Sequence, residues 1–229
     1  MWRQMGHWDI TYLHWLAFQV RAVLLRHSGW MAWNLTLALV AVALAVWLFR
    51  VERPRTVGWW VGFGAFALFL PNAPYVLTDL IHLRWSVEDA PTEMVVIAGV
   101  IPTYLAFLTI GMVAYVVCVE LSVTELHRHF PNASRLAAVT VIHLCSAVGV
   151  VLGRVARLNS WHVVTSPTGT IETTLETLTW RGAPAAVLAV FAAITIAYVV
   201  TRILAVAALG WCRRLRWPLT NTWENSNAR

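Results

Sequence analysis

Five long stretches without Asp, Glu or Arg constrain the fold of this chain more than any other feature. Each is about 18 to 26 residues long and mostly apolar, and a helix needs about 20 such residues to cross the hydrocarbon core of a bilayer. The sequence therefore predicts an all-α bundle of transmembrane helices. The five predicted spans are residues 30–49, 56–78, 94–119, 136–153 and 183–201.

The composition supports a membrane protein and excludes other classes. The chain is 59% hydrophobic and 12% charged, whereas soluble domains carry about 25% charged residues. An ordinary soluble fold, a disordered chain and a small disulfide scaffold are therefore excluded. Cys118, Cys145 and Cys212 show no CxxC spacing, so we expect no disulfide framework, no structural zinc site and no cofactor. No segment outside the apolar stretches is long enough to fold alone, which predicts one domain over residues 1–229.

The arginines predict how the chain is oriented. All 17 basic residues are arginine, and most flank apolar stretches, as expected for headgroup anchors rather than for a nucleic-acid-binding face. Residues 10–25 are also apolar and cover about 24 Å as a helix, which is marginal for a sixth span. With six spans, one side holds ten arginines: Arg3, Arg50, Arg53, Arg55, Arg128, Arg135, Arg213, Arg214, Arg216 and Arg229. The other side holds five: Arg26, Arg84, Arg154, Arg157 and Arg181.

Because cytoplasmic loops are enriched in arginine, six spans place both termini in the cytoplasm. If residues 10–25 instead lie flat on the membrane, Arg3 and Arg21 join the second side and the asymmetry falls to nine against seven. We therefore favour six spans, with five as the alternative.

The second span contains two prolines close together. Fourteen apolar residues, 57–70, precede the segment Pro71-Asn72-Ala73-Pro74-Tyr75. Proline removes a hydrogen-bond donor and clashes with the preceding turn, which predicts a kink near Leu70. We expect the Asn72 side chain to satisfy a backbone group that the kink leaves free. The segment is interpreted either as a structural kink or as a broken helix that lines a cavity.

Two polar arcs follow from helical periodicity. If the helix continues beyond Pro71, Asn72, Tyr75, Asp79 and His82 share an arc of about 80°. On the fourth span, Arg154 and Arg157 lie one turn apart and share a comparable arc with His143. Both arcs reach the outer end of their spans, where ionisable groups usually face the bundle interior.

These arcs predict a pocket near the outer leaflet. One wall comprises Asn72, Tyr75, Asp79 and His82, and the other comprises Arg154, Arg157, Asn159 and Trp161. Two guanidinium groups suit an anionic or phosphate-bearing lipid-like ligand. Membrane lipids are the expected partners, and nucleic acid is not expected.

Four other interpretations stay open. In the first, Asp79 and Arg154 form an ion pair that fixes helix packing, which is a structural or assembly role. Asp79 and His82 are candidate acid and base groups of a membrane-embedded hydrolase. Asp79 and His143 are candidates for proton coupling in a secondary transporter. Asp79, His82 and His162 are weak candidates for metal ligands.

Three strings of this sequence resemble a known family. They are Trp33-Asn34-Leu35, the segment from Leu68 to Leu83 that contains Pro71-Asn72-Ala73-Pro74-Tyr75, and the segment from Leu152 to Trp161. The chain resembles the bacterial integral-membrane family called domain of unknown function 1361, over roughly residues 33–167. The resemblance implies a plasma-membrane protein of bacterial type and singles out the same two polar clusters, and it implies no activity. The family usually has Asp after Asn-Ser-Trp, where this chain has His162.

Overall fold

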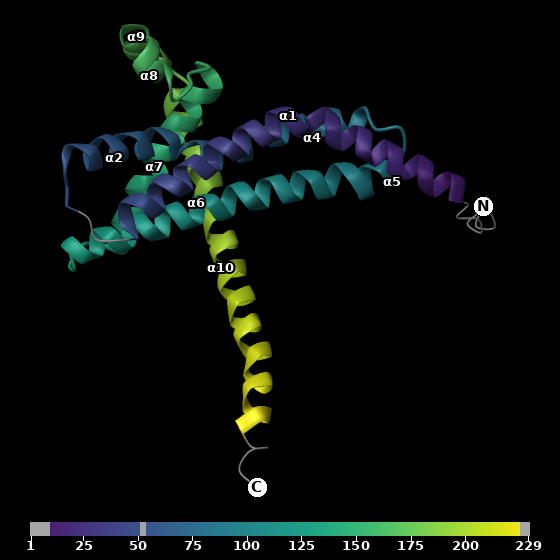
Figure 1. Ribbon diagram of the computed structural model, residues 1–229. Helices are drawn as coiled ribbons and strands as arrows, with labels where there is room; N and C mark the ends of the chain where they lie inside the picture. Colours follow the sequence, from purple (N-terminus) through teal and green to yellow (C-terminus); the bar gives the residue numbers. More distant parts are fainter. Residues whose placement is uncertain (1–9, 51–53, 225–229) are drawn as a thin grey trace.

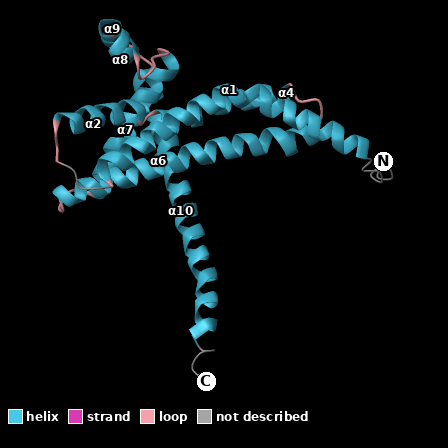
Figure 2. Cartoon of the chain, in the orientation of Figure 1, coloured by secondary structure: helices cyan, strands magenta, loops and turns pink. Residues whose placement is uncertain are grey.

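The computed structural model describes residues 10–50 and 54–224, and these residues form helices, turns and loops without a strand (Figures 1 and 2). Arg3, Arg53 and Arg229, which enter the charge comparison, lie outside the described residues. The α-helices are α1 (Ile10–Phe49), α2 (Val57–Phe69), α3 (Asn72–Tyr75), α4 (Ile81–Glu88), α5 (Glu93–Val95), α6 (Ile101–His129), α7 (Arg135–Val155), α8 (His162–Thr165), α9 (Pro167–Thr179) and α10 (Ala183–Glu224). A 3-10 segment, η1 (Val76–Leu80), joins α3 to α4, and a π-helical segment, η2 (Val96–Val100), joins α5 to α6.

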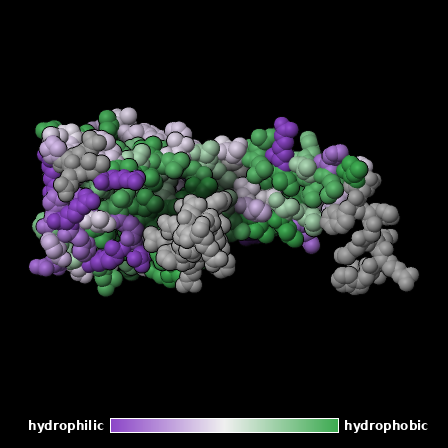
Figure 3. All heavy atoms as spheres, turned by 60° about the horizontal axis from the view of Figure 1, so that its bottom comes forward, coloured by the Kyte–Doolittle hydropathy of each residue, from purple (hydrophilic) through white to green (hydrophobic). Residues whose placement is uncertain are grey.

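Five helical segments of the described chain are long and apolar enough to cross a membrane, which confirms the all-α membrane fold. They are Ser28–Phe49, Val57–Glu88, Glu93–His129, Arg135–Val155 and Ala183–Gly210. Hydrophobic side chains cover much of the face seen in Figure 3, and hydrophilic ones gather toward the end where α2 begins and α6 finishes. Polar residues at the helix ends fit the expected contact with water and headgroups.

The predicted sixth span is not present as a separate helix. Residues 10–25 continue without interruption into the first span as part of α1, which is 40 residues long. No proline lies in this stretch, so nothing ends the helix before Phe49. The first part of α1 packs on the segment before α6, where a Cβ at Gly99 would lie 3.3 Å from Val20. Residues 10–25 therefore extend the first helix and pack on η2, instead of turning back to form a separate span.

The core lies where α1 runs alongside α6 (Figure 1). Ala38, Ala41 and Ala45 are fully buried at spacings of three and four residues on α1, and Tyr115 and Val119 of α6 are fully buried in the same cluster. Small side chains let helix backbones approach closely in a membrane, where the hydrophobic effect does not drive helices together. Helix α10 packs on α7 and α6, and its later part projects away from the other helices (Figure 1).

The second span is interrupted at the two prolines. Helix α2 begins at Val57, where the Thr56 side chain accepts a hydrogen bond from the backbone N–H of Trp59, and it ends at Phe69. Helix α3 begins three residues later, at Asn72. Pro71 has no N–H to donate to the Ala67 carbonyl, and the end of α2 at Phe69 leaves the carbonyl groups of its last turn without helical partners. The Asn72 side chain donates to the Phe69 carbonyl oxygen at 2.9 Å, as the sequence predicted.

Glycine on α6 lets the segment after the break approach the core. A Cβ at Gly111 would lie 2.7 Å from the Val76 side chain and 3.1 Å from the Ala73 carbonyl oxygen. Any larger residue would therefore push α3 and η1 away from α6. This close approach fixes the depth of the chain that carries Tyr75 and Asp79.

Candidate functional site

Asp79 is the centre of a polar cluster that joins three separate segments. Its side chain is 3% exposed. The Asn34 side chain of α1 donates to one carboxylate oxygen at 2.8 Å, and Arg154 of α7 donates to the other at 3.3 Å. A buried carboxylate is costly unless it is paired and hydrogen-bonded, and these two donors satisfy that requirement. The cluster therefore links α1, η1 and α7.

Arg154 is held by more than its ion pair. It donates through Nη2 to the Thr78 carbonyl oxygen at 2.9 Å and through Nη1 to the Tyr75 hydroxyl at 3.4 Å. Its guanidinium carbon also lies 5.7 Å from the centre of the Tyr75 ring, which is within the range of a cation–π contact. The Arg154 side chain nevertheless stays 31% exposed, because the cluster borders a cavity.

This polar cavity has a volume of about 500 Å³. Its lining combines aromatic rings with ionisable groups: Trp30, Asn34, Tyr75, Asp79, His82, Trp85, Ser86, Asp89 and Arg154. The Nε2 atom of His82 lies 4.0 Å from the Asp79 carboxylate, and the His82 side chain is 37% exposed. The His82 ring packs between Trp30, at 5.5 Å, and Trp85, at 5.4 Å between ring centres.

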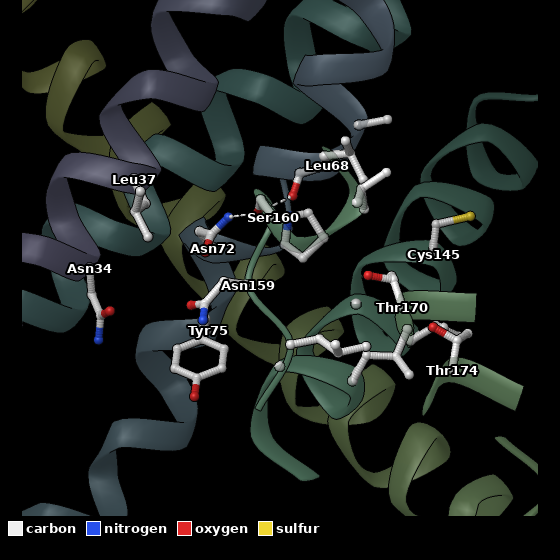
Figure 4. A pocket seen from close by; sticks show the side chains of 18 of the residues that line it. Asn34, Leu37, Leu68, Asn72, Tyr75, Cys145, Asn159, Ser160, Thr170 and Thr174 are labelled. Atoms are coloured by element: carbon white, nitrogen blue, oxygen red, sulfur yellow. Dashed lines mark hydrogen bonds between the residues drawn. The ribbon is translucent and has the colours of Figure 1, made fainter. Parts of the chain in front are cut away.

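A second cavity, the central cavity, adjoins the first. It has a volume of about 420 Å³, and Asn34 and Tyr75 line both cavities. Figure 4 shows Asn34 and Leu37 on one side of it and Cys145, Thr170 and Thr174 on the other, with the Asn159–Ser160 chain between them. Its mixed polar and apolar lining suits the part of a ligand that follows a polar headgroup.

A loop residue ties the end of α7 to the break in the second span. The Ser160 hydroxyl donates to the Leu68 carbonyl oxygen at 2.8 Å and accepts from the Asn72 side chain at 3.2 Å. Ser160 and Asn72 thus satisfy the Leu68 and Phe69 carbonyl groups at the end of α2, where the regular helical hydrogen bonding stops. These hydrogen bonds position one wall of the central cavity.

Six of the eight residues predicted to bind a ligand line one or both of these cavities. Tyr75, Asp79, His82 and Arg154 line the polar cavity, and Asn72, Tyr75 and Asn159 line the central one. The two arcs thus come together as the periodicity indicated, although the chain from Val76 to Leu80 is a 3-10 helix rather than an α-helix.

Arg157 and Trp161 line neither cavity. Helix α7 ends at Val155, and Arg157 adopts a left-handed φ of 54°, so helical periodicity no longer predicts where its side chain points. Trp161 packs instead on Trp33, with the ring centres 6.0 Å apart. The structure therefore provides one guanidinium group at the site, not the predicted pair.

The weaker candidates are separated from the cluster. His162 accepts a hydrogen bond from the Asn159 backbone at 3.3 Å and lines neither cavity. No group of three or more His, Cys, Asp or Glu side chains with metal-binding geometry occurs among the described residues. His143, which is 1% exposed, packs on Tyr198 and hydrogen-bonds to Thr195 of α10. It is therefore not part of the Asp79 cluster.

Sequence reasoning missed Asn34, Trp30 and Ser160 as parts of the site. Asn34 had a recognisable signal, because it is the only carboxamide in the apolar stretch 30–49, and polar groups inside a span usually face a partner. Trp30 and Ser160 carried no such signal, since aromatic and hydroxyl side chains are common near helix ends.

Comparison with known proteins identifies the family. A family model described as "Protein of unknown function (DUF1361)" matches residues 33–200, most of the chain. No curated protein and no solved structure matches the sequence. The matched range contains Asn34, Asp79 and Arg154 together with the loop that carries Ser160. The chain, which has five helices long and apolar enough to cross a membrane among its described residues, therefore belongs to the DUF1361 family of proteins of unknown function.

Proposed function

We propose that this protein binds a phosphate-bearing, lipid-like ligand in the polar cavity. The observation that carries the proposal is the contrast in exposure between Asp79 and the two basic groups beside it. The Asp79 side chain is 3% exposed, because Asn34 and Arg154 cover its oxygens, whereas Arg154 and His82 are 31% and 37% exposed. The other acid of the lining, Asp89, is 68% exposed and pairs with Arg26 at 3.7 Å. A ligand beside Asp79 therefore meets hydrogen-bond donors rather than the Asp79 carboxylate, and these donors favour a phosphate oxygen.

The surroundings favour a ligand that is partly apolar. Trp30, Trp85 and Tyr75 form much of the cavity wall, and Leu80 and Ile81 are exposed next to Asp79. Tryptophan and tyrosine are typical of the membrane interface, where an apolar chain meets a polar headgroup. A headgroup at this level extends its hydrocarbon chain directly into the bilayer.

We place the site near the outer leaflet of a bacterial plasma membrane. With residues 10–25 joined to the first span, the chain makes five crossings and its ends lie on opposite sides, instead of both in the cytoplasm as six spans required. The side that contains the 50–55 and 128–135 loops holds nine arginines against seven, which still favours a cytoplasmic C-terminus. Asp79 and Arg154 both lie toward the ends of their spans that face away from these loops, and therefore toward the outer leaflet.

Ligand binding is tested by native mass spectrometry with dioleoyl phosphatidic acid and dioleoylglycerol as probes. Arg154→Lys keeps a cation beside Asp79 but loses the guanidinium fork, and His82→Gln removes the second exposed donor. Each lost charge-assisted hydrogen bond is worth about 1.5–3 kcal/mol, so we expect the Kd for phosphatidic acid to rise about tenfold or more. Arg202→Lys and His127→Gln, which line none of the three cavities of the structure, are matched controls that should leave the Kd unchanged. Equal retention of the two lipids by the wild-type protein would refute the proposal.

A second candidate function is hydrolysis of a phosphoester. The favouring observation is that His82 faces the cavity with its Nε2 atom 4.0 Å from the Asp79 carboxylate, an arrangement in which a carboxylate orients a histidine that moves a proton. Incubation with dioleoyl phosphatidic acid tests it, through release of inorganic phosphate that His82→Gln abolishes. Unchanged lipid after prolonged incubation with a protein that binds it would leave binding alone as the function.

A further inference from the structure

A third cavity extends the two described above toward the opposite end of the bundle. This aromatic cavity has a volume of about 390 Å³ and an accessible surface that is mostly apolar, with Trp60, Phe63 and Phe66 among its walls. Arg55, Glu125 and His129 also line it, and Glu125 forms ion pairs with the other two. Ala67, Pro71 and Cys145 line both the central and the aromatic cavities. The three cavities therefore adjoin one another in a row that leads from the Asp79 cluster, past the helix break, to the level of Arg55 and His129.

The row of cavities is open to the surrounding membrane along part of its length. Trp60 is 55% exposed, Phe63 and Leu68 are 38% exposed, and Val141 is 58% exposed. In a bilayer, apolar surface of this kind contacts hydrocarbon rather than water. The walls come from α2 on one side and α7 on the other, and Ser160 bridges the two elements at Leu68.

Polarity falls along this row from the Asp79 cluster to the aromatic rings, although the aromatic cavity also has the ion-paired Arg55, Glu125 and His129 in its lining. The end at Asp79 contains the exposed donors of Arg154 and His82, the central cavity has hydroxyl and carboxamide groups beside leucine and valine, and the accessible surface of the aromatic cavity is mostly apolar. An amphiphile has the same gradient along its length. From Arg154 to Ile142, which lines the aromatic cavity, α7 covers about 18 Å at a rise of about 1.5 Å per residue, which a long hydrocarbon chain spans and a short one does not.

We propose that the central and aromatic cavities hold the hydrocarbon chain of the phosphate-bearing ligand, so that the protein selects lipids with one long chain beside the phosphate. This inference rests on the proposed headgroup site and adds the class of chain. The chain enters at Asn34 and Tyr75, passes Pro71 and ends among Trp60, Phe63 and Phe66. The break in the second span lies along this path, because Pro71 lines both the central and the aromatic cavities. It separates the end of α2 from the segment that carries Asp79.

Cys145 gives a direct readout, because its thiol is exposed where the central and aromatic cavities meet. Cys118 is fully buried, and Cys212→Ser removes the third cysteine of the sequence. The rate at which N-ethylmaleimide modifies Cys145 in this background is measured with octyl phosphate or hexadecyl phosphate, which share one headgroup. We expect both probes to bind and hexadecyl phosphate alone to slow the modification, at least fivefold.

A blocking variant provides the second measurement. Ala67→Trp fills the junction at which the two cavities meet, and Ala192→Trp, at an exposed position of α10 that lines no part of the row, is its matched control. We expect Ala67→Trp to lower the preference for hexadecyl over octyl phosphate at least fivefold, and Ala192→Trp to leave the preference unchanged. The preference for hexadecyl over octyl phosphate is compared between the wild-type protein and each variant in the same detergent. Partition of the two probes into micelles is then the same for every protein and cancels from the change in preference.

The outcomes separate this inference from the headgroup site. If both phosphates bind, Arg154→Lys weakens both, and neither protects Cys145, the chain does not lie in these cavities and the inference is wrong while the headgroup site stands. If hexadecanol protects Cys145 as well as hexadecyl phosphate does, the cavities bind a hydrocarbon chain equally well with and without a phosphate group. The headgroup site is then refuted. Binding of neither phosphate refutes both.

Discussion

The molecule contains two carboxylate clusters at opposite ends of its helices, and they differ in how completely their groups are covered. Asp79 is 3% exposed and receives two hydrogen bonds, the one from Arg154 at 3.3 Å. Glu120 of α6 is 33% exposed and receives shorter hydrogen bonds from Arg135, Arg202 and Tyr198, at 2.6–2.8 Å.

The comparison shows that the length of a carboxylate's hydrogen bonds and the exposure of the donors around it are separate properties. Glu120 uses its oxygens to clamp α6, α7 and α10 together at a surface where water and headgroups can replace any one donor. The Asp79 cluster borders cavities and leaves Arg154 and His82 partly exposed, although its carboxylate is sealed. The looser arrangement, with a buried acid and accessible donors, is therefore the one suited to a ligand.

The largest difference between the clusters should appear when each loses an arginine. Arg154→Met leaves a sealed carboxylate without its cation, and breaking a buried ion pair costs about 3–5 kcal/mol. Arg202→Met removes one of three donors from an accessible carboxylate and should cost less than about 1 kcal/mol. SDS-induced unfolding in mixed micelles measures both. Similar losses in the two variants would contradict the role given to burial.

A double-mutant cycle sharpens the same contrast. Asp79→Asn combined with Arg154→Gln removes both charges, so the double variant should recover about 2 kcal/mol relative to the sum of the single variants. The matched cycle, Glu120→Gln with Arg135→Gln, should give a coupling energy below about 1 kcal/mol. A coupling energy at Glu120 that equals or exceeds the one at Asp79 would show that contact distance, rather than burial, decides the energy.

The close approach of α6 should matter more beside the Asp79 cluster than elsewhere. Gly111→Ala places a methyl group against Val76 and the Ala73 carbonyl oxygen, and overpacking of this kind costs about 1–3 kcal/mol. Gly64→Ala is the matched control, since nothing lies within 4 Å of its added Cβ. The unfolding assay measures stability, and the Kd for phosphatidic acid reports whether Asp79 shifts. Equal stability of the two variants would argue against tight packing at this point.

The smallest expected effect is at the bridge between the two cavity walls. Ser160→Ala removes the hydrogen bonds with Leu68 and Asn72, for an expected loss of about 1 kcal/mol. Ser122→Ala, whose hydroxyl bonds only to the Cys118 carbonyl within its own helix, is the comparison and should change the unfolding free energy by less than half as much. A neutral Ser160→Ala would mean that water takes over both hydrogen bonds.

Much of the fold follows from local properties, and these were predictable. Each apolar stretch is long enough to cross a bilayer on its own, so the five spans follow without knowledge of their neighbours. The helix break is also local, because Pro71 lacks a donor wherever it lies. By contrast, the joining of residues 10–25 to the first span depends on packing against η2, which no local pattern describes.

The site was predictable only in part, for a related reason. Periodicity correctly grouped Tyr75, Asp79 and His82, and it placed Arg154 at the matching level of another span. It failed at Arg157, because the helix ends two residues earlier and the chain turns through a left-handed conformation. Periodicity could not identify Asn34 as a partner of Asp79, because the contact between two helices depends on which of their faces pack together.

The sequence by itself determined that this chain is an all-α membrane protein with at least five long apolar helices, and it predicted a disturbance of the helix at Pro71, since hydrophobic length and proline geometry act within each segment. Only the tertiary structure decided that Asn34 and Arg154 cover Asp79, that Arg157 lies outside the cluster, and that three cavities adjoin along α2 and α7. Those features arise from the close packing of α6 at Gly111 and from hydrogen bonds that Ser160 makes across 88 and 92 residues of sequence. Such long-range contacts decide which helix faces pack together, and the sequence of one helix does not specify which other helix packs against it.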